Sequence, residues 1–361
     1  MRYKRVFLAA LIYLFCLFQC VSAVGEDSGF CIHFIDVGQA DAAVILCDDE
    51  VLMIDGGNKG DSSLVYSYLT KTLGIGHIDY MIGTHAHEDH IGGLAGALNA
   101  CTVGTVYSPV TDYDSEAFQD FKRYAEEQVG SLLIPSVGDT FTVGSATVQF
   151  LSPAYQYDDT NDTSIVVRIV YGNTSFLFTG DAGWEPEHDM VESGYDLSST
   201  LLKVGHHGSD TSSSYVFLRE IMPQYAVISV GEGNSYGHPT EDTLSRLRDA
   251  GAIVYRTDLQ GNIICYSDGN LLTFETEKDA PEDGNSDETA WNWGTPVEDG
   301  QEDAVPDETG EAPYIGNKNS KKLHYADCPS VDDMKDKNKV EFYSRDEAIN
   351  QGYEPCKRCN P

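Results

Sequence analysis

The stretch Gly83–Gly93, GTHAHEDHIGG, is the most informative part of the sequence. Positions 85 to 90 hold three histidines and two acids, and paired glycines follow. The apolar run HIDYMI before them is typical of a buried strand, and LAGALNA after them is typical of a helix. Ionisable groups are crowded in this way where something offsets the cost of burying them, and a bound metal ion is one such partner.

The spacing of these residues predicts two pairs of metal ligands. In an extended segment His85 and His87 project to the same side, because side chains alternate with period two. A helix that starts near Asp89 would turn Asp89 and His90 toward the same opening. One short segment would then supply ligands to two adjacent metals. Imidazole and carboxylate groups suit zinc, manganese or iron.

The surrounding sequence predicts a layered α/β fold. From residue 30 to 274, short apolar runs that end in Gly or Asp, such as EVLMIDGG, alternate with helical patterns such as SEAFQDFKRYAEEQVG. Gly172–Asn173 joins two β-rich runs as the turn of a hairpin would. Hairpins at intervals, in place of strict βαβ alternation, favour an α/β sandwich over a doubly wound parallel sheet.

These motifs resemble those of the metallo-β-lactamase superfamily, whose H-x-H-x-D-H signature stands here as His85, His87, Asp89 and His90. The supporting motifs follow in the family's order as FIDVGQAD, MIDGG, FLFTGDA, LKVGHHGS and SYGHP. The resemblance implies a four-layer αββα sandwich over residues 24–274. Within the superfamily, the chain looks like the branch that contains the hydrolase domain of ComEC competence proteins and the choline-phosphate esterases.

The resemblance also implies roles for the site residues. Asp181 would bridge two metals, and His206 or His207 would be the last histidine ligand. Which of these two binds metal stays open, and the other would face the substrate. Asp89 would both bind metal and orient the attacking water. His238 would contact a substrate oxygen or protonate the leaving group, although a histidine that caps a turn before a proline is the alternative.

One departure from the family pattern concerns a histidine that many members carry between the first motif and the bridging Asp. The corresponding segment, YDDTNDTSIVV, has none. The metal at His85 and His87 would therefore lack one protein ligand, with water in its place. Asn161 and Ser164 would bind water or substrate there, or they are ordinary polar loop residues.

Composition limits the class of partner. The net charge of −35 excludes a broad basic surface that coats nucleic acid. It does not exclude a small phosphoesterase site, where bound metal ions dominate the local charge. Residues 275–312 contain fourteen Asp or Glu and one Lys. Such a segment cannot bury a core, so we expect a disordered acidic linker.

Residues 1–23 predict a secretory signal peptide, because three basic residues precede an apolar run and VSA ends at Ala23. An uncleaved membrane anchor is the alternative. We therefore expect a secreted or cell-surface protein with no integral membrane domain after cleavage. Cys31 and Cys47 lie in neighbouring strand-like segments, and the sequence leaves open whether they pair after export.

Residues 313–361 predict a small module held by zinc. His324 and Cys328 form an H-x3-C pair, and Cys356 and Cys359 form a C-x2-C pair, as in closed structural zinc sites. The segment resembles the small zinc-binding module of the Ada DNA-repair protein, with His324 in place of a cysteine, which favours a purely structural metal. A disulfide of Cys328 with Cys356 or Cys359 is the alternative. The lysines of the module would contact DNA, a cell-wall polymer or another anion, or they would face only solvent.

Together these features predict an exported metal-dependent hydrolase with two zinc ions (or manganese or iron) in its active site and one structural zinc ion. The expected substrate is a phosphoester, in the first place single-stranded DNA cleaved by a ComEC-like phosphodiesterase. A cell-surface phosphorylcholine-type esterase is the alternative enzyme. A non-catalytic anion-binding protein that keeps the fold is the alternative from a different class.

Overall fold

The computed structural model describes residues 29–279 and, near the C-terminus, residues 314–326, 328–332, 334–342, 348 and 352–356. The predicted signal peptide, residues 280–312 of the predicted linker and Cys359 lie outside the described residues. Among the residues that are described, no helix is long and apolar enough to cross a lipid bilayer.

The first sheet has seven strands in the order β14–β13–β1–β2–β3–β4–β5. Strands β13, β1, β2 and β3 pair with antiparallel neighbours, whereas β3, β4 and β5 run parallel. The strands are β1 Phe30–Phe34, β2 Ala42–Cys47, β3 Glu50–Gly56, β4 His77–Ile82, β5 Thr102–Tyr107, β13 Ile263–Ser267 and β14 Leu272–Thr276.

The second sheet also has seven strands, in the order β12–β11–β10–β9–β8–β7–β6. Strands β6 to β9 form an antiparallel meander, and β9 to β12 run parallel. The strands are β6 Thr140–Val143, β7 Ala146–Ser152, β8 Val166–Tyr171, β9 Thr174–Phe178, β10 Leu201–Lys203, β11 Tyr225–Ile228 and β12 Ile253–Arg256.

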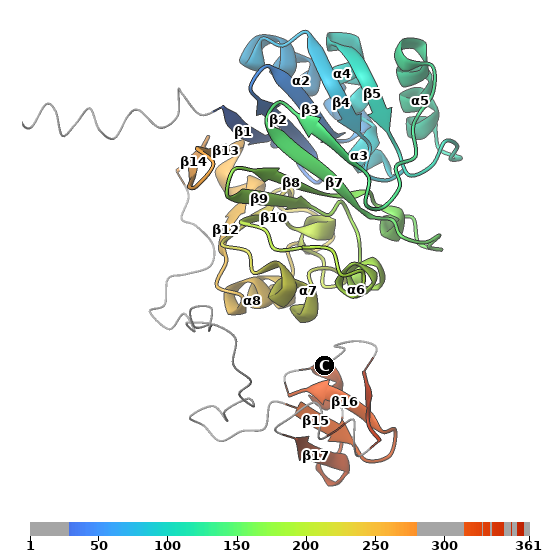
Figure 1. Ribbon diagram of the computed structural model, residues 1–361, viewed down its shortest axis with the longest axis vertical. Helices are drawn as coiled ribbons and strands as arrows, with labels where there is room; N and C mark the ends of the chain where they lie inside the picture. The colour runs from blue at the N-terminus through green and yellow to red at the C-terminus, as the bar shows by residue number, and fades with distance from the viewer. Residues whose placement is uncertain are drawn as a thin grey trace, which may run out of the picture.

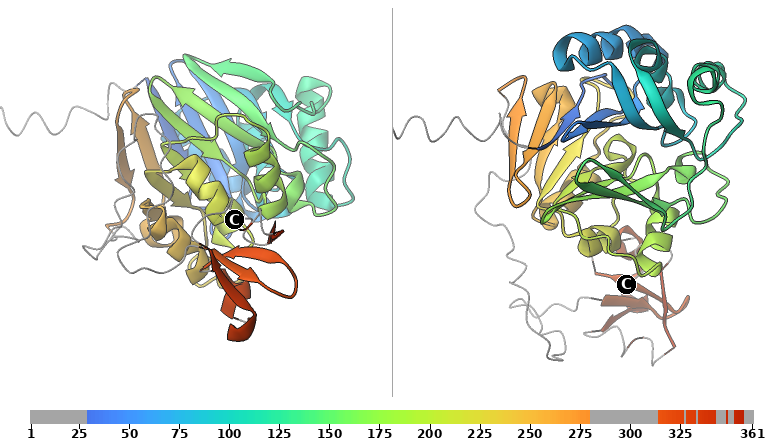
Figure 2. Two further views of the ribbon diagram at one scale, coloured as in Figure 1. Left: turned by 60° about the horizontal axis from the view of Figure 1, so that its bottom comes forward. Right: turned by 45° about the horizontal axis from the view of Figure 1, so that its top comes forward.

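The two sheets pack face to face, and helices cover both outer faces (Figures 1 and 2). One apolar cluster, which includes Phe30, Phe34, Phe150 and Phe178, lies between the sheets. Two further clusters join each sheet to its own helices. The predicted four-layer αββα sandwich is confirmed. The helices are α2 Ser62–Ser67, α3 Glu88–Ile91, α4 Leu94–Ala100, α5 Glu116–Val129, α6 Trp184–Glu192, α7 Tyr215–Ile221, α8 Glu241–Asp249 and α9 Thr257–Gln260.

The strand register answers the question left open for Cys31 and Cys47. Cys31 lies opposite Leu46, and Cys47 lies opposite Phe30. Because successive side chains point to opposite faces of a strand, the two cysteines face opposite sides of the sheet. Cys47 lies in the core between the sheets. Both residues are free thiols, so the structure does not form this disulfide.

The described C-terminal residues form a separate small sheet in the order β17–β15–β16–β18. Its core contains Leu323, Phe342, Ala348 and Tyr353. The elements are β15 Tyr314–Asn317, β16 Lys322–Tyr325, α10 Pro329–Asp332, β17 Lys339–Phe342 and β18 Glu354–Pro355.

The parallel strands determine where polar loops gather. In each sheet the carboxyl ends of parallel strands lie at one edge, which is where α/β proteins place their binding sites. The loops that follow β4, β9, β10 and β11 begin at these ends. They contain the segments 83–93, 179–183, 204–214 and 229–240, in which most of the predicted site residues lie.

Candidate metal centre

The loop Gly83–Gly93 adopts the predicted geometry. His85 is fully buried, and its Nε2 lies 3.1 Å from Nδ1 of His87. His87 is the N-cap of helix α3, so Asp89 and His90 fall in the first helical turn. A single short segment therefore presents all four side chains to one region, as the spacing predicted.

The paired glycines let helix α3 approach the end of strand β3. A Cβ atom on Gly93 would overlap the carbonyl oxygen of Gly56, and a Cβ atom on Gly92 would overlap the backbone nitrogen of Lys59. No side chain fits at either position. This contact between backbones brings the histidines of the loop close to Asp55 on β3.

Asp55 fixes the orientation of His90. The carboxylate of Asp55 accepts hydrogen bonds from the backbone N–H and from the hydroxyl of Thr84, both at 2.8 Å. Its Oδ2 also lies 2.8 Å from Nδ1 of His90. When Nδ1–H donates to a carboxylate, the other ring nitrogen keeps its lone pair for a ligand. Nε2 of His90 then points at Asp181, 3.2 Å from its Oδ1.

Asp181 occupies the middle of the cluster. It follows strand β9, and its backbone N–H donates to the hydroxyl of Ser164. Its carboxylate lies 3.9 Å from His85 Nε2 and 3.7 Å from His207 Nε2, besides its contact with His90. Burial raises the pKa of Asp181, but His90 and His207 outweigh burial and hold the pKa well below its usual range. A central ionised carboxylate suits a shared metal ligand.

The segment Gly205–Gly208 turns sharply, so that one of its two histidines is buried and the other is more exposed. His206 and His207 both have left-handed backbone conformations, with φ values of 50° and 52°, which are uncommon outside glycine and often mark functional loops. His207 is buried, and its Nε2 lies 3.3 Å from Asp89 Oδ2. His206 is more exposed, and its Nδ1 lies 3.2 Å from the hydroxyl of Thr211.

His207 is oriented by groups that the sequence did not single out. Its Nδ1 donates to the carbonyl oxygen of Ser229 at 3.0 Å and lies 3.3 Å from Asp41 Oδ1. The other oxygen of Asp41 lies 2.7 Å from Nζ of Lys203. Asp41 stands in the FIDVGQAD motif, but Asp36 of that motif binds the backbone N–H of Gly38, outside the cluster. The sequence feature that could have identified these groups is a charged residue in an otherwise apolar stretch, which both Asp41 and Lys203 are.

The predicted substrate-binding residues lie beside the cluster and differ in their hydrogen bonding. Ser164 is fully buried, and its hydroxyl donates to the carbonyl oxygen of Asn161 and accepts from Asp181 N. Ser164 therefore holds the loop that carries Asp181 in place, and its hydroxyl is not available to a substrate. The Oδ1 atom of Asn161 and the Nδ1 atom of His238 are buried without a hydrogen-bond partner among the described residues. The His238 ring lies 5.7 Å from the His206 ring.

The cluster has the properties of a metal site. The ligand atoms of His85, His90 and Asp181 lie within 4.8 Å of one another, as do those of Asp89, His90 and His207. Three buried ligand atoms have no hydrogen-bond partner among the described residues, namely His90 Nε2, His207 Nε2 and Asp181 Oδ1. Each such atom costs about 1–3 kcal/mol. Divalent cations bound by nitrogen and oxygen ligands would satisfy all three, so the residues fit the metal that the motif implies.

A second group of ligand-type side chains lies in the C-terminal sheet. The ligand atoms of His324, Cys328 and Cys356 are buried and lie within 4.8 Å of one another. Cys359, the predicted fourth ligand, lies outside the described residues, and the zinc site itself stays a prediction. The alternative, a disulfide of Cys328 with Cys356 or Cys359, likewise stays a prediction.

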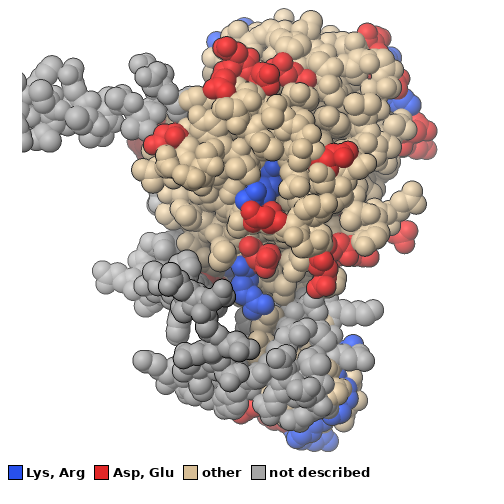
Figure 3. Space-filling view, viewed as in Figure 1, with Lys and Arg blue, Asp and Glu red and all other residues tan. Residues whose placement is uncertain are grey.

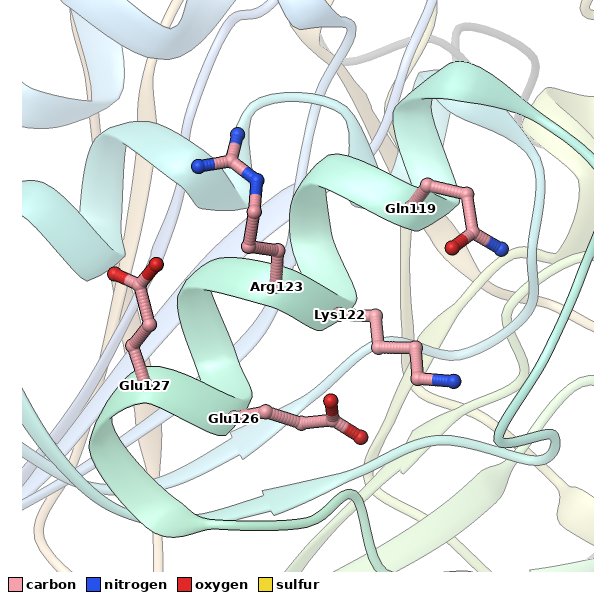
Figure 4. A pocket seen from close by; sticks show the side chains of 5 residues that line it. All are labelled: Gln119, Lys122, Arg123, Glu126 and Glu127. Carbon is pink, nitrogen blue, oxygen red and sulfur yellow. The ribbon is translucent and has the colours of Figure 1, made fainter.

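A surface recess on helix α5 is unrelated to either group. It is lined by one helix face (Figure 4), namely Gln119, Lys122, Arg123, Glu126 and Glu127. These side chains are long and polar, and none of them belongs to the two ligand clusters.

Comparison with known proteins agrees with the site. A family model described as "Metallo-beta-lactamase superfamily" matches residues 35–232, more than half of the chain. Competence protein ComA of Neisseria gonorrhoeae is 32% identical over 228 residues, which cover 63% of this chain and 30% of ComA. ComE operon protein 3 of Bacillus subtilis (strain 168) is 28% identical over 272 residues, which cover 70% of this chain and 34% of that protein. The chain thus spans about a third of the length of these relatives.

Among solved structures, the metallo-β-lactamase fold protein YhfI of Bacillus subtilis is 16% identical, with a TM-score of 0.42 and coverage of 67% of this chain and 99% of YhfI. The family match, the sandwich and the His/Asp cluster that suits divalent metals agree with one another. The chain belongs to the metallo-β-lactamase superfamily, whose members are generally metal-dependent hydrolases, and competence proteins are among its relatives.

Proposed function

We propose that this protein is an exported phosphodiesterase that hydrolyses single-stranded DNA with two divalent metal ions, zinc, manganese or iron. The observation that carries the proposal is the convergence of five ligand-type side chains, from two loops, on the carboxylate of Asp181, which belongs to a third loop. These loops are far apart in sequence, and their buried ligand atoms lack partners in the described protein. A purely structural cluster would satisfy these atoms internally.

We assign the ligands by the groups in which they lie together around Asp181. Asp89, His90 and His207 would hold one metal, and His85 and His87 would hold the other. Asp181 would serve both. Two bound metals would make a water molecule acidic enough to attack near neutral pH and would stabilise the charge that develops on the phosphoryl oxygens.

The assignment makes His207 the ligand and leaves His206 for the substrate. His207 is buried and is held at Nδ1 by the Ser229 carbonyl oxygen, the usual arrangement for a metal-binding histidine. His206 lies at the edge of the cluster, and its Nε2 is 3.8 Å from Asp181 Oδ2. From there it would donate a hydrogen bond to a phosphoryl oxygen.

Two further groups would handle protons. Oδ2 of Asp89 lies 3.3 Å from His207 Nε2, and the Asp89 side chain is about one-third exposed. Its free oxygen would orient the attacking water. His238 lies beyond His206, and its burial together with the neighbouring His206 lowers its pKa. A histidine at this position would contact the leaving oxygen and return a proton to it.

The choice of DNA as substrate rests on the relatives. They are named for competence and, in Haemophilus influenzae, for recombination, and both processes handle DNA. On the face shown in Figure 3, the sandwich carries scattered acidic side chains and only small, separate groups of Lys and Arg, whereas further Lys and Arg lie on the C-terminal sheet. The substrate would therefore be bound at the metals rather than along a basic surface. A phosphorylcholine-type esterase is the competing enzyme, and a non-catalytic anion-binding protein is the competing class.

The proposed function also includes a role for each end of the chain. The signal-like residues 1–23 would direct export, so that the hydrolase acts outside the cytoplasm. The module 313–361 would hold one structural zinc ion and would contact DNA or a cell-wall polymer through its lysines.

The proposal is tested with the metal-loaded full chain on three substrates, namely single-stranded DNA, bis(p-nitrophenyl) phosphate and p-nitrophenyl phosphorylcholine. His87→Ala serves as the inactive control. We expect cleavage of DNA and of the diester, both lost in the variant. Cleavage of the choline ester without DNA would favour the surface esterase. Full metal content without hydrolysis of any substrate would contradict an enzyme of this kind.

A further inference from the structure

An exposed tyrosine lies beside the metal cluster on the loop after β11. Tyr236 is 71% exposed, and its ring stacks on that of His238, with 5.8 Å between ring centroids and 26° between planes. The His238 ring meets the edge of His206, and His206 Nε2 is 3.8 Å from the carboxylate of Asp181. Three rings therefore form a continuous path from the surface to the cluster.

The loop that carries Tyr236 is held by one side chain. Oδ1 of Asn234 accepts hydrogen bonds from the backbone N–H groups of Tyr236 and His238, both at 3.1 Å. Nδ2 of Asn234 donates to the carbonyl oxygens of Gly231 and His238. The exposed ring is thus positioned before any ligand arrives, which reduces the entropy lost on binding.

A positioned aromatic ring with an exposed face suits a flat partner. Single-stranded nucleic acids are held by bases that stack on such rings, at about 1–3 kcal/mol per base. This contribution matters more where Lys and Arg are sparse, because phosphate contacts then supply little of the affinity. We propose that Tyr236 is a stacking platform for a nucleobase next to the phosphodiester that is cleaved. The inference rests on the proposed function and adds to it a subsite for the base.

The same ring is less suited to a quaternary ammonium group. Choline is recognised by cages of several aromatic faces around the cation. Among the described residues, the ring contact of Tyr236 is with His238 alone. One stacked pair offers a flat face rather than a cage, and a flat face matches a base.

The test compares two oligonucleotides on the metal-loaded full chain, an intact single strand and an abasic strand of the same length. The variants are Tyr236→Ala, Tyr236→Phe and the matched control Tyr66→Ala, which removes another exposed tyrosine, on helix α2. For intact DNA we expect Tyr236→Ala to raise KM about fivefold to a hundredfold, with a smaller change in kcat. The ratio of the abasic to the intact KM should fall toward one. Tyr236→Phe should behave like the wild type, because it keeps the ring, and so should Tyr66→Ala.

Three results would overturn the inference. The first is an unchanged KM for intact DNA in Tyr236→Ala. The second is a Tyr236→Phe variant as impaired as the alanine variant, because the hydroxyl and not the ring would then matter. The third is a rise in KM for p-nitrophenyl phosphorylcholine with no change for DNA, which would assign the ring to a cation.

Failure of the proposed function gives a different pattern. If the wild type cleaves neither oligonucleotide, binding of a fluorescent single strand decides the matter by anisotropy. Weaker binding to Tyr236→Ala than to Tyr236→Phe would still support base stacking on a non-catalytic protein. Equal binding would reject the platform as well.

Discussion

The carboxylate of Asp41 lies 2.7 Å from the ammonium group of Lys203, and both side chains are almost completely buried. Asp41 comes from the loop between β1 and β2, and Lys203 ends strand β10 of the other sheet. Burial opposes the ionisation of Asp41, but Lys203 and His207 outweigh it and hold the pKa of Asp41 well below its usual range. The pair thus joins the two sheets directly behind His207, and it places a negative charge at His207 Nδ1.

We predict that Asp41→Asn weakens both the fold and the metal site. The variant leaves Lys203 buried without its counter-charge, which should lower the free energy of unfolding by about 3–5 kcal/mol. It also removes the charge that supports His207, so metal affinity should fall about tenfold or more. Urea unfolding and competition with a chelator measure the two effects.

The double variant Asp41→Asn/Lys203→Met separates them. It contains no unpaired buried charge and should recover much of the stability, but not the metal affinity. Asp36→Asn, a change in the same loop outside the cluster, is the matched control. Full recovery of metal affinity in the double variant would mean that Asp41 acts only on the fold.

We predict that the two adjacent histidines differ in metal binding. His207→Ala removes a proposed ligand and should leave one metal ion fewer per chain. His206→Ala should keep the metal content of the wild type and lose turnover, because the residue is proposed to contact substrate. Metal analysis and kinetics on the same samples check this. Loss of a metal ion in His206→Ala but not in His207→Ala would show that His206 is the ligand.

We predict a steric effect at the end of the metal-binding loop. Gly93→Ala places a Cβ atom on the carbonyl oxygen of Gly56, so the free energy of unfolding should fall by about 1–3 kcal/mol or more. The matched control is Gly60→Ala, where nothing lies within 4 Å of the added Cβ atom. The control should stay within about 0.5 kcal/mol of the wild type. Equal stability of the two variants would show that α3 does not pack as described.

We predict that His33 makes stability depend on pH. Burial lowers the pKa of His33 to about 4, from a value of 6.5. Below pH 6.5 the unfolded chain gains a proton that the folded chain does not, so this contribution to stability is lost as the pH falls from 6.5 toward 4. Between about pH 7.5 and about pH 5.5, the wild type should lose about 1 kcal/mol more than His33→Phe.

The control for His33 is Tyr68→Phe. It removes the hydroxyl that lies 3.0 Å from His33 Nδ1 but keeps the titrating ring. It should retain the wild-type dependence on pH. The same dependence in His33→Phe as in the wild type would rule out His33 as the cause.

Local pattern was enough to predict the α/β sandwich and the placement of four candidate ligands in one loop. His85, His87, Asp89 and His90 lie within one strand-to-helix loop, so their relative positions follow from short-range geometry. The strands and helices around them also follow from local periodicity. The family resemblance added the more distant Asp181, which the structure places beside the loop.

Other features depend on contacts between distant segments. Asp41 gains its importance from Lys203, which belongs to the second sheet, and no local pattern links the two. The difference between His206 and His207 arises from two left-handed backbone conformations in succession. The separation of Cys31 from Cys47 follows from a strand register that the sequence does not specify. Pairing and packing between separate segments, rather than local propensity, determine the first and the third of these features.

Anomalous diffraction from crystals of the full chain loaded with zinc tests whether Asp181 bridges two metals. We expect two anomalous peaks on either side of the Asp181 carboxylate, about 3.5–4 Å apart. One peak should lie against Asp89, His90 and His207, and the other against His85 and His87. A single peak, or two peaks that Asp181 does not touch, would rule out a bridging role for Asp181.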